Sequence, residues 1–381
     1  MSCDQEFFRT EITFVDHVRD RQTADVHLLI TSQATGAGGQ ELTFSFFGQN
    51  RYQGSDHVLR QTLPVASSAD DVRREMVRVI SLGLIPYAIQ ASTLENLTVV
   101  TQRRPRVALP PQADPWNRWT FRSQVNGSGS GEAQTTLANA SGLVNANRTT
   151  EATKFNASVT AGYAESTFSL PDSGRYVSVN HNFGSSILFA RSLGDHWSAG
   201  LRASLSSTTF RNQDLAWYVA PAIEYDVFPY SESTRRLLTM QYSAGVRAFD
   251  YHVETLFGKL SERKAAQELI TALTARQRWG TLSAGIDAFS YVPDVKYNNV
   301  SGWGDVDLNL YKGLSLNVSI ELSSVRDQLY LPKGRATAEE ILVRQRQLAT
   351  DYQYFYSFGI SYTFGSIYSP VVNPRFRRGG F

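Results

Sequence analysis

Cysteine is nearly absent from this chain, because Cys3 is the single cysteine among 381 residues. One thiol provides neither an intrachain disulfide framework nor a cysteine-based metal cluster, so both are excluded. Cys3 is compatible with a flexible terminal thiol, with a lipid-modified mature N-terminus, and with half of a disulfide whose partner has been lost. The sequence leaves these three alternatives open.

Long hydrophobic runs are absent as well. The chain has no stretch of about eighteen apolar residues, the length that a membrane-spanning helix needs. Its hydrophobic content is 42% and its mean hydropathy is −0.28, which excludes a helical membrane protein. The first residues lack the basic and apolar segments of a secretory signal, so an exported chain is expected to have lost its signal or to be truncated.

The chain also lacks a large net charge, because its 37 basic residues nearly balance its 35 acidic residues and the net charge is +2. This balance provides no basic face for nucleic acid, and we predict no nucleic-acid partner. The six histidines show neither a pair four residues apart nor the spacing of metal ligands. We therefore predict no metal site and no cofactor.

Strict alternation of side chains is present instead, and it is clearest from Tyr352 to Phe364. The even-numbered positions from 354 to 364 are aromatic or apolar, whereas the odd-numbered positions are mostly small and polar. In an extended strand these two sets face opposite ways. The apolar row would promote aggregation in water, but it suits an outer-membrane strand whose other face lines the polar interior of a closed barrel.

The same alternation recurs from residue 117 onward. Most of the segments exceed the roughly nine to eleven residues with which a tilted strand crosses a bilayer, whereas soluble sandwiches usually use about five or six. We predict an all-β transmembrane barrel of about twelve antiparallel strands. A soluble all-β protein, in which the apolar rows pack against a second sheet, is an alternative. The predicted strands are residues 117–130, 133–148, 152–167, 175–192, 197–211, 214–228, 236–250, 264–279, 281–292, 297–311, 314–327 and 352–365.

The first hundred residues show a different pattern, which predicts a small α/β domain of order α-β-β-β-α. We expect helices at 8–18 and 70–82, and strands at 24–30, 41–47 and 58–63. The glycine-rich turn at 34–39 lacks the following helix and the lysine of a phosphate loop, so it predicts a hairpin. Proline density then marks a linker. The predicted divisions are an α/β domain at 1–104, a linker at 105–116, a barrel at 117–366 and a tail at 367–381.

Connection lengths predict the orientation of the barrel, because short turns lie in the periplasm and long loops lie outside. The tight turns are expected at 149–151, 193–196, 280 and 312–313, with 229–235 on the same side, and the long loops at 169–174, 253–263 and 328–351. The N-terminal domain is therefore expected in the periplasm, where it could dock a protein partner. Trp119, Trp197 and Trp279 fall at predicted periplasmic strand ends, which suits headgroup-level aromatics. Thr337 to Glu340 is a capping-box pattern and predicts a helix in the longest loop.

Charged residues on the polar faces of the strands are the candidate functional residues. Inside a narrow barrel they must be hydrated or paired, because an isolated buried charge is very costly. One interpretation is a salt-bridged network that holds the interior shut, and the other is a charged constriction that selects small solutes. These residues are Arg202, Glu224, Asp226, Arg247, Arg276, Arg278, Asp287, Asp305, Asp307 and Glu321.

Three resemblances add to this interpretation. The stretch formed by Gly359, Tyr362 and Phe364 resembles the terminal-strand signal of outer-membrane barrels, which implies the barrel-assembly machinery and outer-membrane lipid as partners. Residues 117–366 resemble the DUF481-like, salt-induced group of bacterial outer-membrane proteins, which implies no catalytic motif. The order of elements in the first domain is similar to the N-terminal domain of TolB.

An enzymatic alternative is considered because twelve strands is also the size of the outer-membrane phospholipase. A Ser-His-Asn set is suggested by His181, Asn182, Ser185 and Ser186, but that family's motif places a serine two residues after the histidine, where this chain has Phe183. We predict a non-enzymatic protein, either a narrow channel or a structural barrel with a periplasmic docking domain. An outer-membrane hydrolase acting at the cell surface is the alternative.

Overall fold

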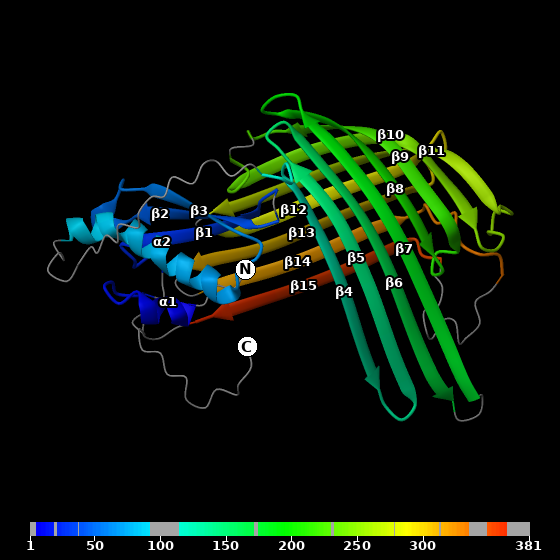
Figure 1. Cartoon of the computed structure of the whole chain (residues 1–381), viewed down its shortest axis with the longest axis horizontal. Helices are drawn as coiled ribbons and strands as arrows, with labels where there is room; N and C mark the ends of the chain where they lie inside the picture. The colour runs from blue at the N-terminus through cyan, green and yellow to red at the C-terminus, as the bar shows by residue number, and fades with distance from the viewer. Residues whose placement is uncertain are drawn as a thin grey trace.

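The computed structural model describes residues 5–18, 21–36, 38–91, 114–170, 174–229, 232–277, 279–311, 314–334 and 349–363. These residues form a three-stranded and a twelve-stranded antiparallel sheet (Figure 1). Several predictions fall outside them: most of the linker at 105–116, Arg278, the helix predicted from Thr337, Phe364 and the tail at 367–381.

The N-terminal unit has the predicted order of elements, with two corrected boundaries. Its elements are α1 Gln5–Glu11, β1 Val26–Ala34, β2 Gln40–Gly48, the 3-10 helix η1 Asn50–Tyr52, β3 His57–Leu63 and α2 Ala69–Gln90. Helix α1 ends at Glu11 rather than near residue 18. Helix α2 continues through Pro86 to Gln90 instead of ending near residue 82, because tertiary contacts bury Tyr87 in the last turn.

Helix α2 packs on one face of the small sheet. Phe44 and Phe46 of β2 are fully buried against its apolar side. Gly83 permits the close approach, since a Cβ there would lie 2.0 Å from the ring of Phe46. The end of the helix is tied down by Tyr87, whose hydroxyl donates a 2.5 Å hydrogen bond to the Ser55 carbonyl.

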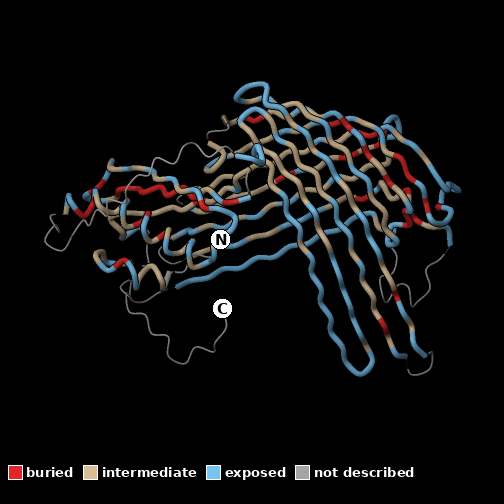
Figure 2. Tube along the Cα trace, viewed as in Figure 1, coloured by how far each residue is buried: buried red, intermediate tan, exposed pale blue. Residues whose placement is uncertain are grey.

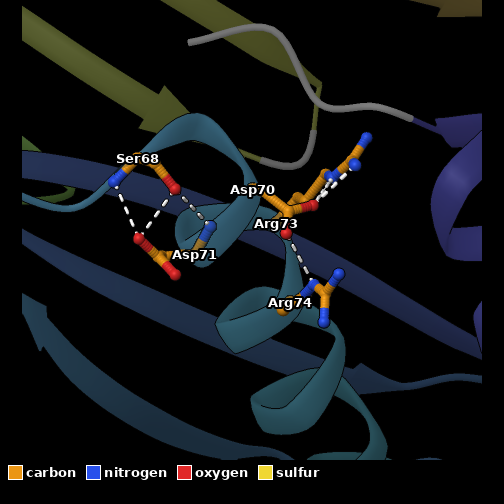
Figure 3. Close-up of polar contacts among 5 residues, drawn as sticks. All are labelled: Ser68, Asp70, Asp71, Arg73 and Arg74. Atoms are coloured by element: carbon orange, nitrogen blue, oxygen red, sulfur yellow. Dashed lines mark hydrogen bonds and ion pairs between the residues drawn. The ribbon is translucent and has the colours of Figure 1, made fainter.

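The first turn of α2 carries a reciprocal cap (Figure 3). The Ser68 hydroxyl accepts a hydrogen bond from the backbone N–H of Asp71, and the Asp71 carboxylate accepts one from the backbone N–H of Ser68 at 2.9 Å. Asp70 pairs with both Arg73 and Arg74. Acidic side chains also suit the positive end of the helix dipole.

The large sheet confirms the twelve predicted strands, and every strand pairs with its neighbours in sequence. Strands β4 and β15 are its edges, and no ladder joins them in the described part of the chain, so closure into a barrel stays a prediction. The strands are β4 Trp119–Gly131, β5 Thr135–Thr149, β6 Thr153–Leu170, β7 Gly174–Ser192, β8 Trp197–Thr208, β9 Gln213–Asp226, β10 Arg236–Tyr251, β11 Ser261–Gln277, β12 Gly280–Val292, β13 Asn298–Tyr311, β14 Leu314–Val325 and β15 Tyr352–Tyr362.

The connections at the two ends of the sheet differ less in length than the sequence predicts. The end at which β4 begins, here called the turn end, carries the connections 150–152, 193–196, 227–235, 278–279 and 312–313. The opposite end, here called the loop end, carries the long connections 252–260 and 326–351, but also the short ones 132–134, 171–173, 209–212 and 293–297. The prediction of a long loop at 169–174 is wrong, because β6 and β7 extend almost to its centre.

Many outward-facing large apolar side chains of the strands are exposed. The edge strands β4 and β15 are exposed along nearly their whole length, as their pale colour in Figure 2 shows. Trp119 and Trp197 lie at the turn end, as predicted. The ring centroid of Trp197 lies 4.7 Å from that of Tyr225, its cross-strand partner on the same face of the sheet. None of the described helices combines the length and the apolar character needed to span a membrane.

Candidate functional site

The predicted charged residues share one face of the twelve-stranded sheet. Strand pairing places Glu224 opposite Gln241, Gln241 opposite Ile270 and Ile270 opposite Asp287, so all four side chains point to the same side. The registers of the other strands put the remaining described candidates on that side too. They are Arg202, Asp226, Arg247, Arg276, Asp305, Asp307 and Glu321.

This face is concave, and one ion pair demonstrates it. Nη1 of Arg202 on β8 lies 2.8 Å from Oε2 of Glu268 on β11. Three strand spacings on a flat sheet would separate these strands by about 14 Å, and Glu268 lies two residues beyond Ala266, the residue level with Arg202, so the short contact indicates that the sheet curves toward this side. The same Arg202 nitrogen donates to Gln241, and Gln241 donates to Glu224, each at 3.2 Å. The four side chains form one polar network across β8 to β11.

Three of the remaining charges are tied to neighbouring polar groups rather than gathered into one ring. Asp305 accepts a hydrogen bond from Ser319 at 2.8 Å, and Asp307 accepts one from Asn317 at 2.5 Å. Arg276 donates to the carbonyl of Thr234 in the β9–β10 connection. These three partners are uncharged, and among the described candidates Arg202 is the one with an ion pair, so the contacts restrain the sheet without forming a continuous salt-bridged network.

An aromatic cluster occupies the same face nearer the loop end. The guanidinium of Arg247 lies 4.8 Å from the ring centroid of Tyr218 and 4.2 Å from that of Phe289. Such stacking stabilises a cation partly removed from water. The buried apolar members of the cluster are Ala216, Tyr218, Ala220, Phe249, Tyr251, Ala266, Phe289, Tyr291 and Leu329.

Leu329 belongs to the β14–β15 connection, so the described start of this loop folds back over the concave face. Residue Asn212 holds it in place, because its amide nitrogen donates to the carbonyls of Val253 and Tyr330, at 2.9 and 3.2 Å. A backbone bridge joins Thr255 to Pro332. The described start of the longest loop therefore lies over the aromatic cluster at the loop end.

The N-terminal unit contacts the sheet at the opposite, turn end. The hairpin turn between β1 and β2 presents the carbonyl of Gly36, which accepts hydrogen bonds from Asn147 at 2.7 Å and Thr120 at 3.4 Å. Both side chains belong to the concave face of β4 and β5. Two further contacts join distant parts of the large sheet: Gln33 donates to Ser233 in the β9–β10 connection at 3.4 Å, and Arg21 donates to the carbonyl of Asn309 on β13 at 2.8 Å.

Sequence reasoning missed several interior charges on β11, notably Glu262, Lys264 and Glu268. Their strand lacks clean alternation, because Arg263 and Lys264 are adjacent and so are Leu269 and Ile270. The signal that could have found them is the pairing of β11 with β10, whose alternation is clear.

The residues of the hydrolase alternative are not assembled. His181 pairs with Tyr163 on the convex face and stacks on its ring at 6.5 Å. Ser186 faces the other way, where its hydroxyl is hydrogen-bonded to Ser158 at 2.8 Å. Within the residues that the structure describes, no three His, Cys, Asp or Glu side chains are grouped as metal ligands would be.

Comparisons with known proteins give distant structural matches. No family model matches the sequence, no curated protein matches it, and the resemblance to the DUF481-like group stays a prediction. The NanC porin matches at 11% identity and a TM-score of 0.31, over 64% of this chain and 99% of that one. The CymD monoaromatic hydrocarbon channel matches at 7% identity and a TM-score of 0.32, over 95% and 92%. The translocator domain of the autotransporter NalP from Neisseria meningitidis matches at 13% identity and a TM-score of 0.19, over 65% and 82%. Scores this low carry no argument about function.

Proposed function

We propose that this chain is a non-enzymatic outer-membrane β-barrel protein that forms a narrow channel for small hydrophilic solutes. In this proposal β4 pairs with β15, the concave face becomes the lumen, and the N-terminal unit lies on the periplasmic side. The lumen would be narrowed by the Arg202–Glu268 network and covered at the loop end by residues 326–334, the described start of the β14–β15 connection.

The observation that supports this proposal best is the uncovered apolar convex face. Ten large apolar side chains on adjacent strands each expose between 41% and 54% of their surface. Soluble monomers rarely leave contiguous apolar patches larger than a few hundred Å² in water, whereas lipid would cover such a face. These residues are Val219, Ile223, Met240, Tyr242, Val246, Leu269, Ile286, Val300, Ile320 and Leu322.

A periplasmic docking role for the N-terminal unit belongs to the same proposal. Strand β3 is an edge of the small sheet, so its outer backbone groups could pair with an added strand. Co-purification of periplasmic proteins with the intact chain, lost when Arg60 on β3 is replaced by proline, would support this role. Proline removes a backbone donor and blocks edge pairing. Unchanged co-purification would contradict it.

The barrel and the channel are tested separately. Electrophoresis of unboiled and boiled samples reports whether a folded barrel forms, and planar bilayers report whether it conducts. Folding without conductance would favour the structural barrel, whereas a monodisperse protein in the absence of detergent would overturn the membrane assignment.

A matched pair of variants tests which face meets lipid. Ile320 faces outward and its neighbour Ser319 faces inward on β14. A lysine on the lipid face near the midplane costs about 2–4 kcal/mol, whereas the interior tolerates charge. Ile320→Lys should therefore reduce the heat-modifiable folded band strongly, and Ser319→Lys should not. The reverse order would contradict the proposed orientation.

A further inference from the structure

The concave face is divided chemically between its two halves. On β8 to β14 it carries the charges described above, but on β4 to β7 it carries mainly amide, hydroxyl and small side chains. Within the described residues of these four strands, Arg122 and Lys154 are the inward-facing charges, and both lie toward the turn end. The uncharged half is therefore a distinct surface.

Two cross-strand rows in this half form a shallow groove. In the first row Asn126 pairs with Ser141, Ser141 with Gly162, and Gly162 with Asn182. The second row is formed by Ser128, Asn139, Ala164 and Asn180. Gly162 and Ala164 lie between larger neighbours in these rows and form the floor of the groove, and the four asparagines and Phe210 also line it.

The floor of the groove must be small. A Cβ on Gly162 would lie 2.1 Å from Oδ1 of Asn182, so that carboxamide occupies the space a side chain would take. Any larger residue at 162 would displace the amide and fill the groove. The glycine thus links the shape of the groove to the position of one of its polar groups.

Neighbouring side chains orient two of the amides. Oδ1 of Asn126 accepts a 3.0 Å hydrogen bond from Gln124, and Oδ1 of Asn180 accepts one of 3.3 Å from Thr209. Their amino groups have no acceptor among the described residues and can donate to a solute. Asn139 and Asn182 likewise make no side-chain hydrogen bond within that part of the chain, so their donors and acceptors are both available.

The chemistry of this wall identifies a ligand class. A carboxamide donates and accepts hydrogen bonds without carrying charge, as a hydroxyl group does. A charged solute would lose hydration here without meeting an opposite charge, which is unfavourable. Building on the channel proposed above, we propose that this carboxamide groove binds an uncharged polyhydroxylated solute, such as a neutral oligosaccharide.

Current block by a neutral probe tests the proposal in the full-length protein reconstituted in planar bilayers. Maltotriose should interrupt the current, and Gly162→Val should raise the half-blocking concentration about tenfold, because it removes the cavity and one or two hydrogen bonds. Asn156→Ala lies on the same face of β6 outside the groove and should leave the block unchanged. Equal block of the wild type and Gly162→Val would overturn the groove assignment.

The channel and the groove can fail independently. If the folded protein does not conduct, saturation-transfer NMR in detergent measures maltotriose binding directly. Binding that is lost in Gly162→Val and retained in Asn156→Ala would support the groove without the channel, and absence of binding would overturn it. Stronger binding of glucuronate or glucosamine than of maltotriose would also overturn the assignment to uncharged solutes.

Discussion

The side-chain amide of Asn147, on the inner face of β5, donates a 2.7 Å hydrogen bond to the backbone carbonyl of Gly36 in the β1–β2 turn. These residues lie 111 positions apart and connect the two sheets. The turn is seated tightly, since a Cβ on Gly36 would lie 2.5 Å from Cβ of Thr149. In the proposed barrel this contact places the hairpin inside the periplasmic rim.

The first prediction concerns this contact. Gly36→Val should expel the hairpin, because overpacking costs about 1–3 kcal/mol and shifts the ratio of seated to released hairpin by a factor of about 5 to 150. Released hairpins should appear as a higher open probability in planar bilayers. Ala34→Val is the control, because Ala34 is exposed at the end of β1. Equal open probabilities for both variants would show that the hairpin does not restrict the lumen.

Gly83 provides a second prediction, on stability. In an exposed helix, replacing glycine by alanine stabilises by about 1 kcal/mol. Here the added methyl group meets the ring of Phe46, so Gly83→Ala should destabilise the N-terminal unit by about 1–3 kcal/mol. The change in the free energy of unfolding is measured from the hydrogen exchange of α2 amides as urea is added. Combining it with Phe46→Leu should recover part of the loss, and strictly additive effects would argue against a direct clash.

The reciprocal cap of α2 predicts a dependence on pH. Hydrogen bonds from the Ser68 side chain and backbone hold the pKa of Asp71 below its ordinary value of 3.8. A carboxyl with a depressed folded-state pKa contributes stability above its unfolded pKa and loses it as the pH falls through the folded value. Protection of α2 amides from exchange should therefore weaken below about pH 3.8, once rates are corrected for intrinsic exchange.

Removal of the cap is the matching test. Ser68→Ala should speed exchange in the first turns of α2 about fivefold at neutral pH, as loss of a serine cap costs about 1 kcal/mol. The difference from the wild type should shrink on acidification, when Asp71 becomes protonated. Ser67→Ala, just outside the cap, should behave as the wild type. A difference that is independent of pH would contradict the role assigned to Asp71.

The sequence predicted the twelve strands well, because each strand records its own faces in its alternation. It did not predict the side-chain contacts that form only when the sheet curves and brings separated strands together. Arg202 was expected in the interior, but its partner Glu268 was missed, since nothing local in β11 indicates a contact three strands away. The run of α2 through Pro86 was missed for a similar reason: Tyr87 is held by Ser55, which precedes β3 in the chain.

The carboxamide groove shows the same limit. Asn126, Asn139, Asn180 and Asn182 each lie in a segment whose alternating pattern predicts a strand. That they lie side by side, however, depends on the registers of β4 to β7. A shift of one residue in the β5–β6 or β6–β7 pairing would turn two of the four to the opposite face from the other two. The sequence of a single strand thus predicts which side chains share a face, whereas a site built from several strands depends on the registers with which those strands pair.

The last prediction is the register with which β4 and β15 close the barrel. The residues level with Trp119 are Arg148, Phe155, Phe189, Leu201 and Pro221, and extending the registers of β9 to β15 brings this row to residue 350. The row therefore starts at the turn end of β4 and arrives at the loop end of β15, as tilted strands require.

The geometry of a closed barrel limits how far this row of residues is displaced along β4 when it returns to its starting strand, which is the shear of the barrel. Twelve strands spaced about 4.8 Å apart, rising about 3.3 Å per residue and tilted about 35–45°, need a shear of roughly 12 to 17 residues. The shear must be even to keep the polar faces together, and a value of about 14 aligns the ends of both edge strands. This value places Ser357 opposite Asn126, both on the inner face.

Cysteine pairs in a Cys3→Ser background test this register. Ser357→Cys should form an intrachain disulfide with Asn126→Cys most readily, because directly opposed residues bring the two Cβ atoms within about 5.5 Å. Gln124→Cys and Ser128→Cys, which correspond to shears of about 12 and 16, report the neighbouring registers. Mass spectrometry of unreduced peptides identifies the linked pair. Disulfides that link two chains instead of one would show that β4 and β15 pair between molecules, and would contradict a barrel closed within a single chain.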